Sequence, residues 1–260
     1  MSEKTSGAVS KLQLSTPEIS LKTVSKLITL KVKRYDPDAG RYKLSIYRVS
    51  VTRFDTVLDA LLKVVRDQDH TLSVRYSCRM GICGSCAMMI NGVPRLACMT
   101  NAISLGDVIE IEPLKNFPPV KDLFVDMDQM FRKHRSVKPW LIRRDEEEQF
   151  TAKKEYLQKP EEVDAYRLFS TCIKCGACMA ACPTVASNPD FLGPMVLAQA
   201  YRWSADSRDE GAHIRFDIVD NPNGVFGCHF AGACSAVCPK NSDPALAIQL
   251  LRKSILRGKR

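Results

Sequence analysis

The chain has 260 residues, of which 45% are hydrophobic and 26% are charged, and its 38 Lys and Arg against 29 Asp and Glu give a net charge of +9. This composition is typical of a globular protein with one large or two ordinary domains and excludes disordered and fibrous classes. No apolar run approaches the roughly 20 residues that span a bilayer. The N-terminal stretch has neither an apolar secretory core nor an Arg-rich transit pattern, so we expect a protein that faces a prokaryotic cytosol.

Eleven cysteines are many for a reducing compartment, where disulfides are rare, and metal binding is the leading explanation. They form two groups, separated by a cysteine-free stretch at residues 99–171. This separation predicts two domains with their own metal centres. We place them at residues 27–128 and 129–260, after an N-terminal extension at residues 1–26.

The first half has the pattern of a small sheet with one helix. Residues 27–33 alternate in polarity as a half-buried strand does, and residues 42–49 form a second expected strand after a turn at residues 36–40. An amphipathic helix is expected next, with Asp55 or Thr56 as its N-terminal cap.

An Asn-Gly pair, the strongest short-range hairpin signal, separates apolar runs at residues 87–90 and 93–98. The second run would carry Cys98 on the far arm of this hairpin. Residues 108–111 make a last strand. A mostly antiparallel sheet with one helix across it resembles the β-grasp of plant-type ferredoxins.

The middle of the chain, residues 121–163, is polar with a helical pattern. Residues 129–144 include six Lys or Arg and no acidic residue, and the acidic residues 145–148 follow. One interpretation is a solvated linker whose charges neutralise each other; the other is a docking surface for a partner subunit. After residue 163 we expect a helical domain that ends in an amphipathic helix at residues 244–256.

The cysteines of the first half follow the order Cys-x4-Cys-x2-Cys, with a fourth after eleven intervening residues. This is the plant-type spacing for a [2Fe–2S] cluster. Gly81 and Gly84 allow the loop to curl and its N–H groups to point at the sulfurs. Structural zinc is the alternative, which the long first step and the glycines disfavour. The expected ligands are Cys78, Cys83, Cys86 and Cys98.

Two runs in the second half share the bacterial-ferredoxin spacing Cys-x2-Cys-x2-Cys-x3-Cys-Pro, but Ala231 replaces the second cysteine of the later run. The fourth Cys of each run ligates the other cluster in two-cluster ferredoxins. Four thiolates then predict [4Fe–4S] and three predict [3Fe–4S]; a second [4Fe–4S] with a non-protein ligand is the alternative. The expected ligands are Cys172, Cys175, Cys178 and Cys238 for [4Fe–4S], and Cys182, Cys228 and Cys234 for [3Fe–4S].

With these motifs in this order, the sequence resembles the iron–sulfur subunits of succinate dehydrogenase and fumarate reductase, from about residue 27 to residue 256. The resemblance implies an α+β fold, with a plant-type ferredoxin β-grasp domain followed by an all-α bacterial-ferredoxin-like domain. The matching segments are the cysteine loop at 75–86, the Ile-Asn-Gly at 90–92, both ferredoxin runs, and residues 138–141, 188–189, 200–202 and 206–209.

The resemblance also implies a role. A partner flavoprotein with covalent FAD would oxidise succinate, and electrons would pass through the [2Fe–2S], [4Fe–4S] and [3Fe–4S] clusters to a quinone. This subunit would hold no dicarboxylate and would lie peripherally on the cytoplasmic face of a prokaryotic plasma membrane, beside one or more membrane-anchor subunits. The same role in a quinol:fumarate reductase, a soluble multi-cluster ferredoxin and a zinc-stabilised interaction protein are the alternatives.

By family position, Pro183, Thr184, His229 and Ala231 would help to line the quinone pocket beside the [3Fe–4S] cluster. His229 would then be a proton or hydrogen-bond partner of the quinone, although a lone histidine is often a surface or packing residue. Ser187 stands where many ubiquinone-using members carry Trp. This difference favours menaquinone or an archaeal quinone.

Positive charge gathers at the ends of the chain, and residues 245–260 hold five Lys or Arg and no acid. The last helix would lie against anionic lipid or an anchor subunit, or else pack on the core with a solvated basic tail. No nucleic-acid module accompanies the charge, so we expect no nucleic-acid partner. The charge instead fits an acidic partner or a membrane surface.

Overall fold

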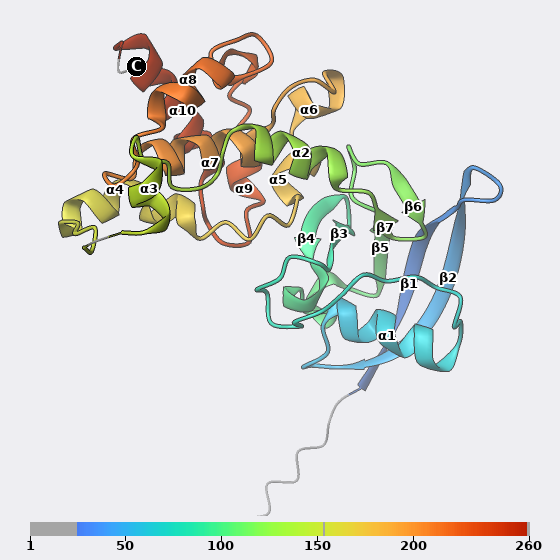
Figure 1. The fold of residues 1–260 in the computed structure, drawn as a ribbon. Helices are drawn as coiled ribbons and strands as arrows, with labels where there is room; N and C mark the ends of the chain where they lie inside the picture. Colours follow the sequence, from blue (N-terminus) through green and yellow to red (C-terminus); the bar gives the residue numbers. More distant parts are fainter. Residues whose placement is uncertain (1–24, 153, 259–260) are drawn as a thin grey trace, which may run out of the picture.

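The computed structural model describes residues 25–152 and 154–258 and has two halves (Figure 1). A sheet half, at the lower right of the figure, is followed by a helical half at the upper left. The expected α+β composition is confirmed. Most of the predicted N-terminal extension, residues 1–26, lies outside the described residues, and the first strand already begins at Ser25.

The sheet has five strands in the order β2-β1-β5-β3-β4. The pair β1–β5 is parallel and the other neighbours are antiparallel. The expected hairpins are both present, and strands β3 and β4 lie on the side nearest the helical half (Figure 1). The strand bounds are β1 Ser25–Asp36, β2 Arg41–Thr52, β3 Ala87–Ile90, β4 Val93–Leu96 and β5 Val108–Glu112.

Helix α1 (Val57–Asp67) packs on one face of this sheet because its apolar side chains share one side. Thr56 caps it: its hydroxyl accepts a hydrogen bond from the Asp59 amide, and the Asp59 carboxylate accepts one from the Thr56 amide. The helix and the inward-facing side chains of the strands form the core of the sheet half, which also includes Cys86, Cys98 and Cys175.

A buried ion-pair network ties this half together. Arg34 of β1 is 4% exposed and donates to Asp122 at 2.7 Å, to Asp69 at 2.6 Å and to the Tyr47 hydroxyl at 3.0 Å. Asp69 follows α1, Tyr47 lies on β2, and Asp122 lies in the turn between the short strands β6 (Pro119–Lys121) and β7 (Phe124–Val125). One guanidinium therefore links four separate segments.

The expectation of a mostly helical segment at residues 121–163 is wrong in part. It contains strand β7 and the helices α2 (Asp128–Ser136) and α3 (Glu146–Phe150), but residues 138–144 are not helical. Arg215, fully buried, forms a double ion pair with Asp209 and donates to the carbonyls of Lys138 and Trp140. These tertiary contacts hold the backbone in a non-helical conformation, so this stretch is neither a helix nor a free linker.

The helical half is built around α7 (Pro194–Ser204), whose residues 194–200 are all buried. Helices α4 (Pro160–Ser170), α8 (Ala212–Val219) and α10 (Pro244–Leu256) pack on it. Helix α10 ends where it was expected to and buries Ile248, Leu251 and Ile255, as the core-packed interpretation predicted. No helix among the described residues is long and apolar enough to cross a membrane. The remaining helices are α5 Ala177–Ala180, α6 Pro183–Ser187 and α9 Ala233–Ala236.

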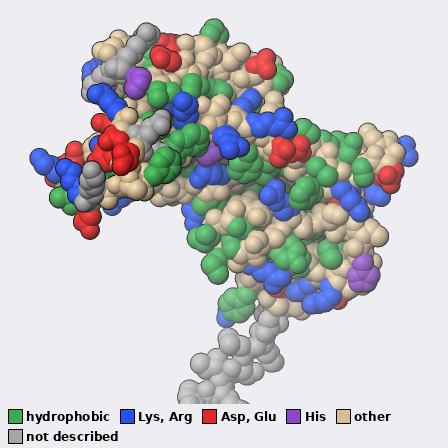
Figure 2. Space-filling view, in the orientation of Figure 1, with side chains coloured by type: hydrophobic (Ala, Val, Ile, Leu, Met, Phe, Trp, Pro, Cys, Tyr) green, Lys and Arg blue, Asp and Glu red, His purple; other side chains and the backbone are tan. Residues whose placement is uncertain are grey.

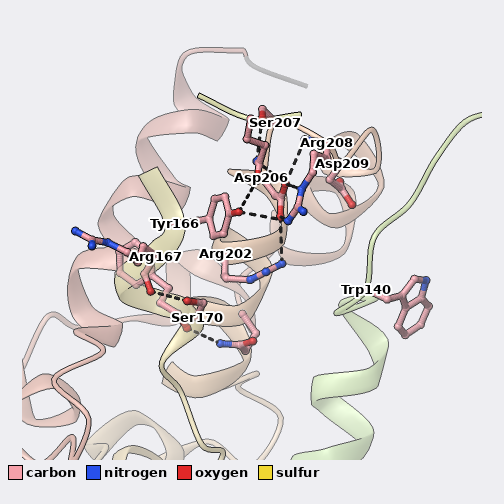
Figure 3. Close-up of polar contacts among 12 residues, drawn as sticks. Trp140, Tyr166, Arg167, Ser170, Arg202, Asp206, Ser207, Arg208 and Asp209 are labelled. Carbon is pink, nitrogen blue, oxygen red and sulfur yellow. Dashed lines mark hydrogen bonds and ion pairs between the residues drawn. The ribbon is translucent and has the colours of Figure 1, made fainter. Parts of the chain in front are cut away.

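The loop after α7 is held by a polar network around Asp206, which is 2% exposed (Figure 3). Arg208 donates twice to its carboxylate at 2.9 Å and also to the Tyr166 hydroxyl, and Arg202 approaches it at 3.5 Å. Burial raises the pKa of Asp206, but the hydrogen bonds from Arg208 outweigh this and lower it. Trp140 points away from this network (Figure 3). The family-like segments at 200–202 and 206–209 thus form one structural unit.

The net positive charge is spread over the surface. In Figure 2, Lys and Arg side chains lie on both halves of the visible face, and a group of acidic side chains lies at the left edge, where α3 lies in Figure 1. Arg143 pairs with Glu148 of α3 at 3.2 Å. Part of the charge alternation in the middle segment is therefore neutralised locally.

Candidate metal centres

All eleven cysteines lie in the described residues and are free thiols. Three of the first four lie in the loop between α1 and β3, and the fourth follows β4. Backbone N–H groups point at their sulfurs, as the glycine pattern predicted: the amides of Ile82 and Cys83 lie 3.3 and 3.2 Å from the Cys78 sulfur. Cys98 was expected on a hairpin arm. It lies instead in a 3-10 turn (Ala97–Met99) just after β4, where its amide donates to the Cys86 sulfur at 3.5 Å.

A second group of cysteines lines one cavity in the helical half. Its walls include three cysteines of the first ferredoxin run and the last cysteine of the second run, so the structure brings together the set predicted for four-thiolate ligation. Cys175 and Cys178 are each 8% exposed. The four cysteines are Cys172, Cys175, Cys178 and Cys238.

A third cavity is lined by Cys182, Cys228 and Cys234, together with Ala231. No carboxylate lines it, and its one histidine is His229. The structure thus places a methyl group in the wall where the repeat has a cysteine in its first copy. Three thiols face this cavity from two runs that are separated by more than forty residues in the sequence.

The two ferredoxin runs repeat in backbone geometry as well as in spacing. Lys174 and Phe230, at equivalent positions, both have a φ of 56°, and the following Gly176 and Gly232 have φ values of 82° and 71°. A short helix then begins in each copy. The internal repeat is therefore structural, and Ala231 occupies the place that Cys175 occupies in the first copy.

The three groups of cysteines lie in series. A Cβ placed on Gly84, in the first loop, would lie 2.8 Å from the Cβ of Cys175 and 2.9 Å from its Cα. Cys178, in the second group, interacts electrostatically with Cys234, in the third. The second group therefore lies between the first and the third.

Burial changes the acidity of these thiols. It raises the pKa of Cys86 to about 12 and the pKa values of Cys175 and Cys234 to about 11. Burial also acts to raise the pKa of Cys83, but hydrogen bonds from Ser85 and Cys78 outweigh it and lower the value to about 6. Metal binding must displace the protons of the buried thiols, because thiolates are the ligands.

Comparison with known proteins identifies the two halves. Residues 29–132 match the family model of a 2Fe-2S iron-sulfur cluster binding domain, and residues 168–242 match that of a 4Fe-4S dicluster domain. The fumarate reductase iron-sulfur subunit of Mycobacterium tuberculosis is 46% identical over 224 residues, which is 85% of this chain and 90% of the relative. The chain belongs to the family of succinate dehydrogenase and fumarate reductase iron–sulfur subunits.

Other members support this placement. The fumarate reductase iron-sulfur subunit of Haemophilus influenzae is 40% identical over 86% of this chain and 91% of that protein. A chain of the Mycobacterium smegmatis Sdh1 complex in the apo form superimposes with a TM-score of 0.82 at 28% identity, covering 91% of this chain and 98% of that one. The protein is therefore an iron–sulfur electron-transfer subunit of this oxidoreductase family.

The residues around each group fit iron–sulfur clusters. In the first loop, five backbone N–H groups already donate to the sulfurs of Cys78 and Cys83, as donors around an anionic cluster do. Beside Cys238, the hydroxyl of Ser242 is buried and has no hydrogen-bond partner among the described residues. Among those residues, no three or more His, Cys, Asp or Glu side chains are spaced to bind a single metal ion.

Four of the five predicted quinone-side residues, Pro183, Thr184, His229 and Ala231, line the third cavity. Ser187 does not; it lies at the end of α6, where its hydroxyl donates to the Thr184 carbonyl at 3.3 Å. Quinone binding by these residues stays a prediction.

Sequence reasoning missed three residues near the centres. Phe230 lines the third cavity and stacks against the Arg252 guanidinium at 4.3 Å. The side-chain amide of Asn116 donates to the backbone carbonyls of Met179 and Cys182. It thereby fixes the end of α5 between two groups of cysteines. Ser242 is the third. None of them carries a sequence signal of its own, because each role arises from contacts between distant segments.

Proposed function

We propose that this protein is the electron-transfer subunit of a membrane-associated succinate:quinone oxidoreductase. Electrons from FAD on a partner flavoprotein would enter at the first loop and leave to a quinone at the third cavity. We infer a plant-type ferredoxin β-grasp for the sheet half, a bacterial-ferredoxin-like helical half, and domain limits at residues 27–128 and 129–260. The clusters would supply one-electron carriers, and the chain supplies their spacing and environment.

The serial arrangement of the cysteine groups carries this proposal. Cys83, in the first loop, is exposed, and so are His229 and Ala231 at the third cavity, whereas Cys175 and Cys178 between them are buried. A chain of redox centres needs accessible centres at its two ends and a buried centre in the middle. Electrons then enter and leave at the partner proteins and are not lost to solvent on the way. The order also assigns the middle position to the four-thiolate group.

We assign [2Fe–2S] to the first four cysteines, [4Fe–4S] to the second cavity and [3Fe–4S] to the third. The methyl group of Ala231 supports [3Fe–4S], since a corner iron there would lack a protein ligand. Pro183, Thr184, His229 and Ala231 would form this subunit's side of the quinone pocket, while anchor subunits would supply the rest. His229 is exposed and would hold or pass a proton at the quinone oxygen.

The surface around Cys83 suits a protein partner. Tyr76, Met80, Ile82 and Met99 are 43%, 67%, 56% and 63% exposed, and the Arg79 guanidinium stacks on the Tyr76 ring at 5.1 Å. Aromatic, Met and Arg side chains are enriched in protein interfaces. We assign this ring of residues to the contact with the flavoprotein, which places its flavin next to the first cluster.

Purification of the native protein from membranes tests the proposal. We expect it to elute in mild detergent with a subunit that carries covalent flavin and with at least one hydrophobic anchor subunit, at the cytoplasmic side of the membrane. Elution alone, from the soluble fraction, would instead support a free multi-cluster ferredoxin.

The same role in a quinol:fumarate reductase is the second candidate. The similar curated proteins are named as fumarate reductase iron-sulfur subunits, whereas the similar solved structure is a chain of the Mycobacterium smegmatis Sdh1 complex. The absence of Trp at Ser187 favours a quinone other than ubiquinone. Rates of succinate oxidation and fumarate reduction by the purified complex, measured with quinones of high and low potential, distinguish the two directions.

A further inference from the structure

Ser242 is an unusual residue beside the second centre, four positions after Cys238 in the sequence. It is 1% exposed, and its hydroxyl oxygen has no hydrogen-bond partner among the described residues. Burying an unpaired hydroxyl is unfavourable, so a buried serine normally donates to a nearby acceptor. The structure therefore leaves one buried donor without a protein acceptor at this site.

The backbone places this hydroxyl beside a predicted cluster ligand. The Ser242 amide donates to the Cys238 sulfur at 3.2 Å, and the Asn241 amide donates to the Cys238 carbonyl at 3.2 Å. Asp243, the next residue, caps α10 and accepts a hydrogen bond from the Ser235 hydroxyl at 2.6 Å. Ser242 is thus held between two fixed neighbours, with its own backbone bonded to the Cys238 sulfur.

The internal repeat provides a comparison within the same chain. Four residues after Cys182, at the position equivalent to Ser242, the first run has Ala186. The amide of Ala186 donates to the Cys182 carbonyl, but the side chain carries no polar group. The first run continues as helix α6 at this point, whereas the second run is not helical here and directs the Ser242 amide at the Cys238 sulfur. Of the two runs, only the second therefore places a hydroxyl four positions after its last cysteine, at a residue whose backbone already bonds to a predicted ligand.

We propose that the Ser242 hydroxyl donates a hydrogen bond to the [4Fe–4S] cluster, at the Cys238 sulfur or an adjacent sulfide, and so raises its reduction potential. This inference rests on the proposed function. A donor stabilises the extra negative charge of the reduced cluster, and hydrogen bonds to the sulfurs are one of the means by which proteins set these potentials. Ser242 is thus a positioning residue that adjusts the reduction potential of the middle cluster. This cluster accepts one electron from the first cluster and passes one electron to the third.

The test is a redox titration of the assembled complex, followed by electron paramagnetic resonance (EPR). Ser242→Ala removes only the hydroxyl and leaves the backbone bond to Cys238. We expect the [4Fe–4S] signal to appear at lower potential, by about 59 mV if the electron-exchange equilibrium changes tenfold. The [2Fe–2S] and [3Fe–4S] potentials should stay unchanged. Ser242→Thr, which keeps a hydroxyl, should have a [4Fe–4S] potential close to that of the unsubstituted protein.

Ser254→Ala is the matched control, because the Ser254 hydroxyl already donates to the Leu250 carbonyl and lies about 15 Å further along α10. It should leave all three potentials unchanged. An unchanged [4Fe–4S] potential in Ser242→Ala, with the signal present, overturns this inference alone. If the unsubstituted protein shows no [4Fe–4S] signal, the proposed function fails instead. Should Ser242→Thr not assemble, the comparison of Ser242→Ala with Ser254→Ala still decides.

Discussion

At the scale of single residues, the two ferredoxin runs differ by the presence or absence of one cysteine thiol. The first ferredoxin run offers a thiol at Cys175, and the second offers the methyl group of Ala231 in the same local backbone. In the proposed assignment, ligand number alone separates the two cluster types within one repeat. Asn116, which approaches from another segment, fixes the end of α5 by donating to the Met179 and Cys182 carbonyls. Ser242 is proposed to act on the second cluster itself.

Replacing Ala231 by Cys tests the ligand count. A fourth thiol in the third cavity should convert the [3Fe–4S] cluster into a [4Fe–4S] cluster, so the EPR signal of the oxidised protein as isolated should disappear and a new signal should appear on reduction. Ala231→Ser is the control, because its hydroxyl is a much poorer ligand and should leave the oxidised signal in place. Persistence of the 3Fe signal in Ala231→Cys, with the protein folded, would contradict the assignment.

At the scale of secondary-structure elements, the junction between the halves is made by loops that hold cysteines. The first loop reaches the helical half at Gly84, and the Cys175 loop packs into the core of the sheet half. The backbone at Gly84 thus lies directly against Cys175, and we expect this contact to set the gap between the first two centres. Such a junction keeps the distance for electron transfer constant.

Gly84→Ala should widen this gap. The new methyl group would meet Cys175, and we expect electron transfer from the first to the second cluster to slow several-fold in flash-reduction measurements. Gly81→Ala is the matched control: φ is 71° at Gly81 and 73° at Gly84, but a Cβ on Gly81 would meet the Met99 side chain, which can move. Both variants carry a similar backbone strain of about 1–2 kcal/mol. Equal transfer rates in the two variants would show that the contact does not set the gap.

The Arg34 network makes a stability prediction. Hydrogen bonds from Thr71 and Tyr47 lower the pKa of Asp69, so its carboxylate stays ionised throughout the neutral range and stabilises the fold there. Asp69→Asn should lower the free energy of unfolding by about 1–3 kcal/mol. Because the folded pKa is depressed, the loss should be the same at about pH 6 and pH 8, and would shrink only below about pH 4.

The thermal midpoint, followed by loss of cluster absorbance, measures this effect. Asp67→Asn serves as the control, since Asp67 forms only an exposed pair with Arg66 and should change little. A fall in midpoint no larger in Asp69→Asn than in Asp67→Asn would contradict the importance of the network.

Sequence patterns predicted the local parts of this fold well and the tertiary parts poorly. The hairpin at Asn91, the Thr56 cap and the helix at residues 244–256 follow from neighbouring residues and are confirmed. Residues 138–144 were expected to be helical, but Arg215, more than seventy positions away, holds their carbonyls. Cys98 was expected on the hairpin arm but lies in the 3-10 turn just after β4, where its amide donates to the Cys86 sulfur. Side-chain contacts between distant segments leave no periodic signal.

At the scale of the whole molecule, the two exposed ends of the cysteine series imply two different partners. The ring around Cys83 is apolar and basic, whereas the loop at His229 and Ala231 lies over the third cavity. A flavoprotein at one end and a membrane-bound quinone at the other would bury both. The positive charge of the surface fits both contacts, since it would face an acidic subunit or anionic lipid.

Ile82→Glu should weaken the flavoprotein contact. Placing a carboxylate in the centre of the apolar ring carries a desolvation cost on binding, so we expect a large part of the flavoprotein to be lost during purification while the clusters and the anchor subunits remain. Val120→Glu, at an exposed apolar residue on β6, is the control and should retain the flavoprotein. Equal retention in the two variants would place the interface elsewhere.

The proposed wiring of the whole molecule requires that the three cysteine groups hold three different clusters in series. An EPR redox titration of the native complex tests it most directly. We expect a [3Fe–4S] signal in the oxidised protein as isolated, a [2Fe–2S] signal on reduction, and a [4Fe–4S] signal at lower potential whose spin couples magnetically to that of its neighbours. Absence of any 3Fe species in the undamaged oxidised protein, or isolated cluster signals without coupling, would contradict it.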